Sequence, residues 1–296
     1  MSKILISGGT GLIGEILHEK LVENNHEVRI LSRNPTKSNE YKWNIKEKYI
    51  DEKVFTDLDF IIHLAGAGIA NKCWTNKRKQ EIIDSRVQST NLLFKKITEL
   101  KTPLKGFISA SGIGYYGAMT SDTIFKEDDK PENDFISNVC VLWENAVKKY
   151  NQINIPTTIL RTGIVLTKNG GALSKMNTPI FLSSLGNGKQ YMPWIHIDDL
   201  CNLYIKAIED NTFTGIYNAV APEHQTNLSF TRTLGTVLSK TILLIKIPSF
   251  VLKTVFGELA KILLYGSRVS SKKITKTGFE FEFKTLNKAL TNLLSK

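Results

Sequence analysis

Short apolar runs alternate with stretches of helical periodicity through the first half of the chain. Runs of four or five mostly apolar residues predict buried strands, and apolar residues recurring every three or four positions predict helices. The predicted strands are 3–7, 28–31, 60–64, 106–110 and 157–160, and the predicted helices begin at Leu12 and span 74–100 and 134–150. No strand or helix is predicted in the polar stretch that ends at Lys48. This alternation predicts an α/β fold with a doubly wound parallel sheet.

The pattern changes after Arg161, where glycines and prolines separate short apolar segments and indicate long loops. We expect residues 1–165 to form the sheet domain and 166–296 a smaller, mixed α/β part that binds substrate. Segments near 194–220 are expected to return to the main domain. The apolar residues from 250 to 264 have helical spacing. A helix on a membrane surface is one interpretation, and packing onto the domain is the one favoured here.

A glycine-rich turn joins the first predicted strand to the first helix. It consists of Gly8, Gly9, Thr10, Gly11, Leu12, Ile13 and Gly14. At such a turn glycine permits a tight bend, close approach of a pyrophosphate to the backbone, and helix packing on the sheet. The phosphates then bind the amides at the helix N-terminus. The position between strand and helix makes the motif typical of a Rossmann-type dinucleotide domain, against the alternative of a glycine turn without a ligand.

The end of the second strand indicates which dinucleotide binds. An NAD site of this fold places Asp or Glu about 20 residues after the glycines, to accept from the ribose 2'-hydroxyl. Here the chain has Ser32 and Arg33 instead. No carboxylate would repel a 2'-phosphate, and a guanidinium binds phosphate through two charge-assisted hydrogen bonds. We therefore predict NADP as cofactor, the alternative being an ordinary solvated surface arginine.

Composition narrows the class of partner. The formal net charge is +11 over 296 residues, but the lysines are spread along the chain without a long basic run, so we expect no nucleic-acid partner. Three distant cysteines and five scattered histidines predict neither a disulfide framework nor a metal site. With no apolar run long enough to span a bilayer, a soluble, cytoplasmic protein without a membrane partner is expected.

Several further segments resemble the extended and atypical short-chain dehydrogenase/reductase superfamily, and within it the epimerase-like family related to human short-chain dehydrogenase subfamily 39U. The likeness covers essentially the whole chain. The segments that carry it are His63–Gly66, Trp74-Thr75 with Arg78-Lys79 and Ser85-Arg86, Ser109–Ser111 with Gly114–Gly117, Arg161–Val165, Gly170–Leu173, Trp194–Asp199 and Gly278–Phe281.

The resemblance implies where the chemistry takes place. The superfamily uses a Ser or Thr to hold the substrate oxygen, a Tyr to pass its proton and a Lys four residues later, with hydride moving to or from the nicotinamide. Ser111 occupies the serine position. In many members a Glu follows that Lys by four residues and precedes the Arg that ends the next strand by about 17, as Glu144 precedes Arg161. Counting back from Glu144 places Cys140 at the lysine position and Ile136 at the tyrosine position, so the Tyr-Lys pair is absent.

Two neighbouring phenols offer a replacement for the missing tyrosine. Tyr115 and Tyr116 follow Ser111 closely, and either could supply a proton from a different backbone position. The alternative is that both pack beneath the cofactor or the substrate loop. We therefore take Ser111, Tyr115 and Tyr116 as the candidate catalytic residues.

The resemblance also implies further cofactor contacts. Leu64, Ala65 and Gly66 follow a strand and should approach the adenosine or ribose through backbone, and Val165 should lie on the nicotinamide side. Glu81 and Arg86 lie on the following helix and are implied to contact NADP, with surface charge as their alternative role.

Two classes of function compete. The first is an NADP(H)-dependent oxidoreductase or epimerase-like enzyme acting on a small carbonyl, hydroxyl or nucleotide-sugar-like substrate. The second is a non-catalytic protein that binds NADP(H) and reports its redox state. The retained serine and the glycine-rich loops of the second half favour the enzyme, and the missing Tyr-Lys pair favours the sensor. The sequence leaves the oligomeric state open, a homodimer included.

Overall fold

The computed structural model describes residues 1–178, 181–243 and 246–295. Its centre is an eight-stranded sheet in which only the edge strand β4 runs antiparallel to its neighbour. In spatial order the strands are β12 (Gly215–Ala219), β8 (Thr157–Thr162), β6 (Gly106–Gly112), β5 (Phe60–His63), β1 (Lys3–Ser7), β2 (Glu27–Ser32), β3 (Glu40–Asn44) and β4 (Tyr49–Ile50). The strand order reverses between β1 and β5, which is where this class of sheet forms its ligand crevice.

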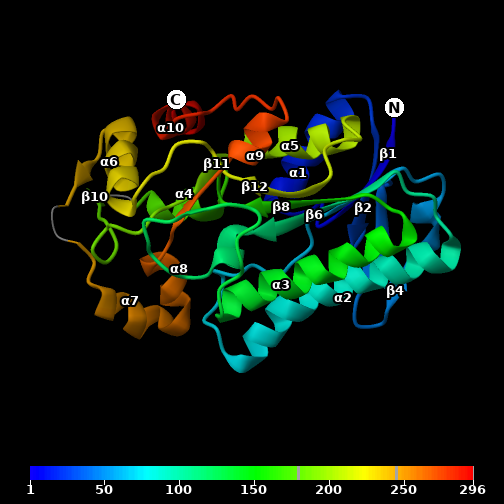
Figure 1. Ribbon diagram of the computed structural model, residues 1–296, viewed down its shortest axis with the longest axis horizontal. Coiled ribbons are helices and arrows are strands. Elements are labelled where there is room, and N and C mark those ends of the chain that lie inside the picture. Colours follow the sequence, from blue (N-terminus) through cyan, green and yellow to red (C-terminus); the bar gives the residue numbers. More distant parts are fainter. Residues whose placement is uncertain (179–180, 244–245, 296) are drawn as a thin grey trace.

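Helices cover both faces of the sheet, as Figure 1 shows. One face carries α1 (Leu12–Glu23) and α5 (Ile197–Glu209), and the other carries α2 (Asn76–Leu100) and α3 (Phe135–Lys148). Successive strand residues point to opposite faces. Ile4 therefore packs in the cluster that contains Leu17 of α1, and Leu5 in the cluster that contains Leu93 of α2. The predicted doubly wound Rossmann-type fold is confirmed.

Two strands that the sequence did not predict lie in the polar stretch that ends at Lys48 and directly after it. β3 pairs with β2 in parallel, and β4 returns antiparallel to β3. Trp43 and Ile50 anchor them, and these side chains are 4% and 2% exposed. One buried residue per short strand produces no apolar alternation, so the hydrophobic pattern contained no signal for this edge of the sheet.

The second half adds short elements around the carboxyl edge of the sheet and on the α1–α5 face. Phe230 and Leu290 belong to the same buried cluster as Leu17. The remaining elements are η1 (Glu52–Phe55), η2 (Ile113–Tyr116), β7 (Ile124–Phe125), η3 (Lys149–Ile153), β9 (Ile164–Leu166), α4 (Gly171–Met176), β10 (Phe181–Leu182), β11 (Trp194–His196), α6 (Asn227–Leu238), β13 (Thr241–Ile242), α7 (Ser249–Phe256), η4 (Gly257–Ala260), α8 (Lys261–Leu264), β14 (Arg268–Val269), α9 (Lys272–Lys276) and α10 (Leu286–Leu294).

The apolar segment 250–264 does not form the continuous packed helix that its spacing suggested. α7 ends at Phe256, and the next residue, Gly257, has a φ of +57° that favours glycine. The segment packs onto the domain through Leu252, Leu259 and Ala260, which are 5%, 5% and 1% exposed. The outer side of α7 does not share in this packing, because Phe250 and Val255 are exposed there. Within the described residues, no helix is long and apolar enough to cross a membrane.

Candidate cofactor and reaction site

The turn after β1 requires glycine at two positions. Gly8 has a φ of +78°, and a Cβ there would lie 2.9 Å from the backbone nitrogen of Ala65. A Cβ on Gly14 would lie 2.3 Å from the carbonyl oxygen of Gly8. The ends of β1 and β5 and the start of α1 therefore approach more closely than side chains allow, which is the packing role of glycine in a dinucleotide-binding turn.

The N-terminus of α1 has no side-chain cap. Its N-cap is Gly11, whereas Thr75, Asp134 and Thr226 cap α2, α3 and α6 by accepting from an amide in the first turn. The first amides of a helix lack intrahelical partners and carry partial positive charge. Those of α1 are thus left to an external acceptor such as phosphate. Thr10 and Gly11 are exposed and Leu12 and Ile13 are half-buried around this point.

The end of β2 presents a free guanidinium beside the glycine turn. Ser32 is buried, and its Oγ accepts from the amide of Asn34 at 3.3 Å. The side chain of Arg33 is exposed, and no hydrogen bond or ion pair engages it within the described part of the chain. Arg33 can therefore meet a 2'-phosphate without losing an internal partner.

The side chain of Arg86 on α2 binds the backbone of the loop that follows β5. Its Nη1 donates to the carbonyl oxygens of Ala67 at 3.1 Å and Ile82 at 3.0 Å. Its guanidinium carbon lies 3.0 Å from where a Cβ on Gly66 would stand. Burial lowers the pKa of Arg86 to about 10. Arg86 thus fixes the backbone of this loop, and its direct contact with a cofactor stays a prediction.

Glu81 and Val165 have other neighbours in the structure. The carboxylate of Glu81 is exposed and forms an ion pair of 2.7 Å with Nη1 of Arg78, and the hydrogen bond from Arg78 lowers the pKa of Glu81. Val165 lies on β9, half-buried, and pairs with Ile195 of β11. Leu64 is half-buried and Ala65 buried at the end of β5. The roles of these residues as cofactor contacts also stay predictions.

His63 links the strands beneath the glycine turn. Its Nδ1 lies 2.6 Å from Oγ of Ser7, the last residue of β1. Its Nε2 lies 3.2 Å from Oγ of Ser89 and 3.1 Å from Oγ1 of Thr90 on α2. Burial lowers the pKa of His63 to about 3, so the imidazole is neutral at physiological pH.

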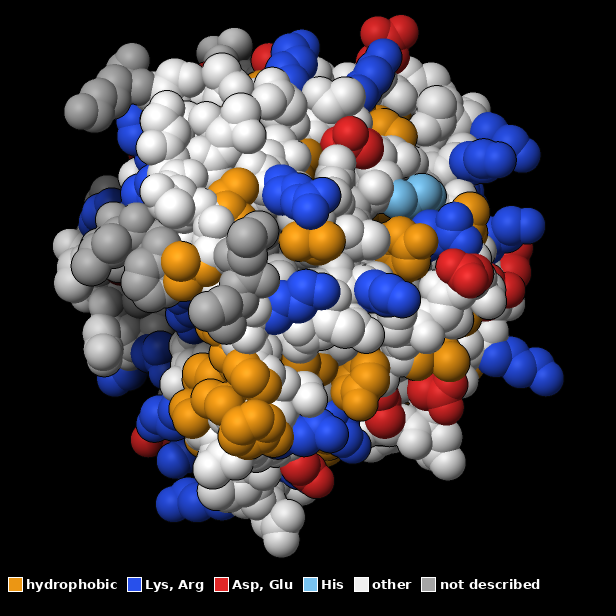
Figure 2. All heavy atoms as spheres, turned by 90° about the vertical axis from the view of Figure 1, so that its left-hand side faces the viewer, with side chains coloured by type: hydrophobic (Ala, Val, Ile, Leu, Met, Phe, Trp, Pro, Cys, Tyr) orange, Lys and Arg blue, Asp and Glu red, His pale blue; other side chains and the backbone are white. Residues whose placement is uncertain are grey.

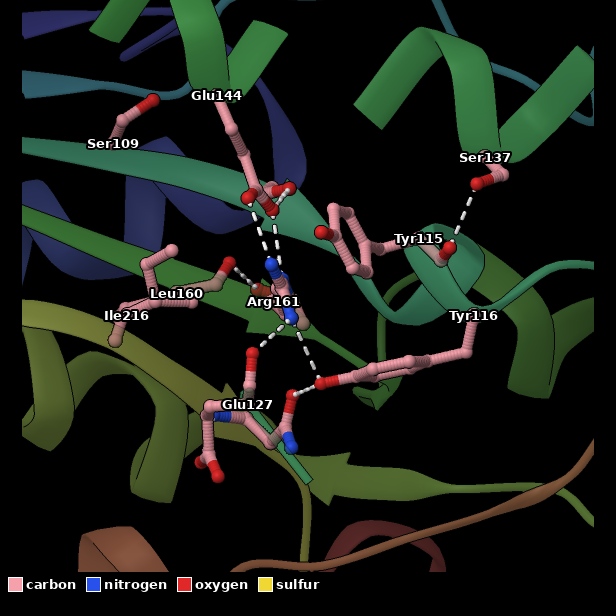
Figure 3. Close-up of polar contacts among 12 residues, drawn as sticks. Ser109, Tyr115, Tyr116, Glu127, Ser137, Glu144, Leu160, Arg161 and Ile216 are labelled. Carbon is pink, nitrogen blue, oxygen red and sulfur yellow. Dashed lines mark hydrogen bonds and ion pairs between the residues drawn. The ribbon is translucent and has the colours of Figure 1, made fainter. Parts of the chain in front are cut away.

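The reaction end of the crevice is built on a buried ion pair. Arg161 on β8 binds Glu144 on α3 through two bonds, Nε to Oε1 at 2.8 Å and Nη2 to Oε2 at 2.9 Å. Both side chains are 1% exposed. Ser111, near the end of β6, donates its hydroxyl proton to Oε1 of Glu144 at 2.8 Å. The predicted catalytic serine is therefore hydrogen-bonded to the Glu144–Arg161 pair, which Figure 3 shows.

Tyr116 belongs to the same network and is fully engaged. Its hydroxyl donates to Oδ1 of Asn218 at 2.7 Å and accepts from Nη1 of Arg161 at 3.0 Å. Burial raises the pKa of Tyr116 to about 12. A phenol that is 2% exposed and doubly bonded is poorly placed to exchange protons with a substrate.

Tyr115 differs from its neighbour. Its ring centroid lies 3.4 Å from the guanidinium carbon of Arg161, a cation–π contact, and its backbone carbonyl accepts from Oγ of Ser137 at 2.7 Å. Figure 3 draws no interaction at the Tyr115 hydroxyl. The side chain is half-buried. Of the two predicted tyrosines, Tyr115 alone keeps a phenol that is not engaged within the described residues.

The positions of the superfamily's Tyr and Lys are both filled by buried side chains. Ile136 and Cys140 lie one turn apart on α3, and a Cβ on Gly112 or Gly114 would lie 3.7 Å from the Cys140 sulfur. Burial, reinforced by the charge of Glu144, raises the pKa of the Cys140 thiol to about 12. The thiol is therefore protonated and cannot take the role of a lysine ammonium.

A cavity of about 260 Å³ opens beside Ile136, between the start of α3 and the segment after α7. Aromatic and charged side chains share its wall, among them Trp74, Lys79, Phe135 and Glu258. It provides room for a small molecule next to the predicted tyrosine position. In the described part of the chain, no group of His, Cys, Asp or Glu side chains could hold a metal ion.

Sequence reasoning missed two members of the network. Glu127 accepts from Nη1 of Arg161 through its carbonyl at 3.0 Å and from the amide of Asn218 through its carboxylate at 2.9 Å. Asn218 on β12 also bonds the carbonyl of Ser270 through Nδ2, at 3.3 Å. The acidic loop around Glu127 gave no sign of this role. The one available signal was Arg161, a charged residue continuing an apolar strand.

Comparisons with known proteins agree with this architecture. The model of the NAD dependent epimerase/dehydratase family matches residues 4–219, and that of a domain of unknown function, DUF1731, matches residues 247–293. The mouse epimerase family protein SDR39U1 is 35% identical and is aligned over 99% of this chain and 100% of its own. An epimerase family protein of Mycobacterium leprae is 33% identical over 97% of this chain and 94% of its own.

The structure of the human epimerase family protein SDR39U1, crystallised with NADPH, resembles the whole chain. It superimposes with a TM-score of 0.87 at 32% identity and covers 98% of each chain. A nucleoside-diphosphate sugar epimerase from Corynebacterium glutamicum superimposes with a TM-score of 0.81 at 27% identity, over 99% of this chain and 58% of its own.

Proposed function

The chain belongs to the NAD dependent epimerase/dehydratase family, and from that premise we propose that it is a cytoplasmic, NADP(H)-dependent oxidoreductase or epimerase-like enzyme. Its substrate would be a small carbonyl, hydroxyl or nucleotide-sugar-like compound, bound between the sheet domain and residues 166–296. The observation that carries this proposal is the unengaged phenol of Tyr115, whose ring lies against Arg161, the ion-pair partner of the Glu144 carboxylate to which Ser111 donates.

The chain's own residues fit NADP. The uncapped start of α1 would hold the pyrophosphate, and the free guanidinium of Arg33 would bind the 2'-phosphate. The glycines at positions 8 and 14 provide a cradle that a Cβ would fill. The human relative crystallised with NADPH supports the same assignment. When bound, the nicotinamide supplies or accepts the hydride.

Holding the substrate oxygen and transferring its proton are assigned to two different residues, Ser111 and Tyr115. Ser111 donates to Glu144, so its oxygen is free to accept a hydrogen bond from a substrate hydroxyl. In the reductive direction Tyr115 would give its proton to the carbonyl oxygen as hydride reaches the carbonyl carbon, and would regain it from solvent. Glu144 and Arg161 act as positioning residues, because they fix Ser111 and the ring of Tyr115 without facing the substrate.

A second candidate is a protein that binds NADP(H) without turnover and reports its redox state to a partner. The observation in its favour is that Ile136 and Cys140 fill the Tyr and Lys positions with buried groups that cannot transfer protons. The two candidates differ in one measurable quantity, which is hydride transfer that depends on the phenol.

The test is a screen of carbonyl compounds and sugar nucleotides with NADPH and NADP⁺, followed by three variants. Loss of a general acid costs about 10²–10⁴-fold in kcat, so we expect Tyr115→Phe and Ser111→Ala to lose turnover while keeping the wild-type Kd for NADPH. Tyr116→Phe is the matched control, because it removes a phenol of the same loop that does not face substrate. Its expected cost is about 1–2 kcal/mol of stability, from buried partners left unsatisfied.

Full turnover in Tyr115→Phe would overturn the assignment of the proton donor. NADPH binding without turnover across the panel, in wild type and variants alike, would favour the sensor.

A further inference from the structure

The outer side of α7 is apolar and exposed. Phe250 is 69% exposed, Val255 is 60% exposed and Val251 is 36% exposed, while Leu252 on the inner side is 5% exposed. We call Phe250, Val251 and Val255 the α7 patch. Figure 2 shows a large gathering of hydrophobic side chains low on this face, bordered by Lys and Arg. One apolar side of this helix packs on the domain, and a second apolar side faces outward. Such an exposed apolar side marks a surface for interaction with a partner or a membrane.

The charge around the patch is positive. Residues 246–264 contain three lysines, Lys246, Lys253 and Lys261, and a single acid, Glu258. Glu258 forms an ion pair with Lys79 of α2, so its charge is already matched. All three lysines are exposed. The patch therefore lies in a cationic surrounding, and the whole chain carries a net charge of +11.

A second copy of the chain is a poor occupant for this surface. A stable dimer buries about 20–30 residues on each side, and the patch has three. In a two-fold interface the same surface meets itself, so Lys253 would face its own copy across the axis. Both the area and the charge argue against this arrangement.

An anionic lipid surface matches both features. Apolar side chains of an interfacial helix enter the boundary between headgroups and acyl chains, and the lysines around them attract anionic lipids. We propose that the α7 patch inserts shallowly into an anionic bilayer surface and attaches the protein there reversibly. The apolar pattern of the chain predicted no membrane partner, and the absence of a spanning helix among the described residues is compatible with surface attachment.

Docking would also bring the cavity beside Ile136 near the lipid. η4 and α8 follow α7 directly, and Glu258 and Lys261 of these elements line the cavity beside Ile136. An attached α7 therefore brings the wall of that cavity toward the bilayer surface. The membrane proposal itself stands on the α7 patch and its lysines, whether or not the protein turns over a substrate.

The test is flotation of the full chain with vesicles of phosphatidylcholine alone or mixed with phosphatidylglycerol. Wild type should bind the mixed vesicles and lose binding as salt is raised, and it should bind pure phosphatidylcholine poorly. Phe250→Ser with Val255→Ser should weaken binding to mixed vesicles about tenfold or more, because two apolar side chains no longer leave water. Lys253→Gln should weaken it by a smaller factor.

The matched control is Val22→Ser with Leu142→Ser, which removes two exposed apolar side chains, 49% and 37% exposed, from α1 and α3. This variant should bind as wild type does, and thermal unfolding should show that all variants remain folded. Equal binding by wild type and the α7 double variant would overturn the proposal. So would failure of wild type to float with the mixed vesicles, or a wild-type dimer that the α7 variant turns into a monomer while vesicle binding is absent.

Discussion

The two ends of the crevice are built in opposite ways. At the cofactor end, the first turn of α1 has no side-chain cap, the guanidinium of Arg33 has no partner within the described structure, and the glycines leave no side chains in the way. At the reaction end, Ser111, Tyr116, Glu144 and Arg161 satisfy one another, and only Tyr115 keeps an unengaged hydroxyl. The cofactor end thus leaves polar groups open to a ligand, and the reaction end pairs most of its polar groups within the protein.

The difference shows how binding and chemistry separate within one fold. Unsatisfied donors at a helix terminus are tolerated when water or a ligand meets them. A buried ion pair must be satisfied within the protein, because an uncompensated charge in the interior is expensive. We therefore expect substitutions at the cofactor end to change affinity, and substitutions in the buried network to change stability first.

The strongest test of this contrast is Arg161→Met. It leaves the carboxylate of Glu144 buried without its cation, and breaking a buried pair in this way costs about 3–5 kcal/mol. Urea unfolding should show that loss. Glu144→Leu combined with Arg161→Met should recover much of it, since no charge then stays buried. A loss below about 1 kcal/mol in the single variant would mean that the pair behaves like a surface ion pair.

At the cofactor end the largest expected effect comes from Gly14→Ala. The added Cβ would lie 2.3 Å from the Gly8 carbonyl oxygen, so the turn must shift before NADPH can bind. Because a positioning error of this size removes several hydrogen bonds to phosphate, the Kd for NADPH should rise about 100-fold or more. Isothermal titration calorimetry measures it, with circular dichroism as a check on folding. An unchanged Kd would place the pyrophosphate elsewhere.

Arg33→Ala should have a smaller and more selective effect. The charge-assisted bonds that are removed are worth about 1.5–3 kcal/mol. The Kd for NADPH should therefore rise about 10- to 100-fold, and the Kd for NADH should stay nearly unchanged. Arg232→Ala removes an exposed arginine of α6 and serves as the matched control. If Arg33→Ala lowered the affinity for NADPH and NADH equally, the guanidinium would not bind the 2'-phosphate.

At physiological pH the smallest effect is that of His63, which appears only as a pH dependence of stability in acid. The pKa of His63 is lowered from its usual 6.5 to about 3 in the folded chain, so between these values the unfolded chain binds more protons. Stability should therefore fall as pH drops through this window, by up to about 1.4 kcal/mol per pH unit. His63→Gln should flatten the decline measured by urea unfolding between pH 6.5 and pH 4. A decline identical to wild type would assign it to other groups.

The sequence pattern predicts the structure correctly where residues close together in the chain determine the local conformation. The glycine turn, the strand before it and the helix after it follow from spacing alone, and β1 has the bounds that the pattern predicted. At the reaction end the sequence indicated Ser111, Tyr115 and Tyr116, but not the network that holds them. Nothing local to Glu127 or Asn218 reveals that they meet Arg161 and Tyr116, because those contacts join residues 34 and 102 positions apart. The unpredicted strand β3 has the same cause, since its order comes from pairing with β2.

The neighbours of Cys140 limit how this chain could evolve or be redesigned. In sequence terms, two substitutions, Ile136→Tyr and Cys140→Lys, would restore the superfamily's proton-transfer pair. A lysine ammonium at position 140 would, however, enter a dry pocket that already feels the charges of Arg86 and Arg161, with Glu144 committed to Arg161 and Ser111. The lysine step is therefore costly on its own. A laboratory lineage aiming at standard chemistry would have to dismantle the arginine network first and give up stability before gaining a catalyst.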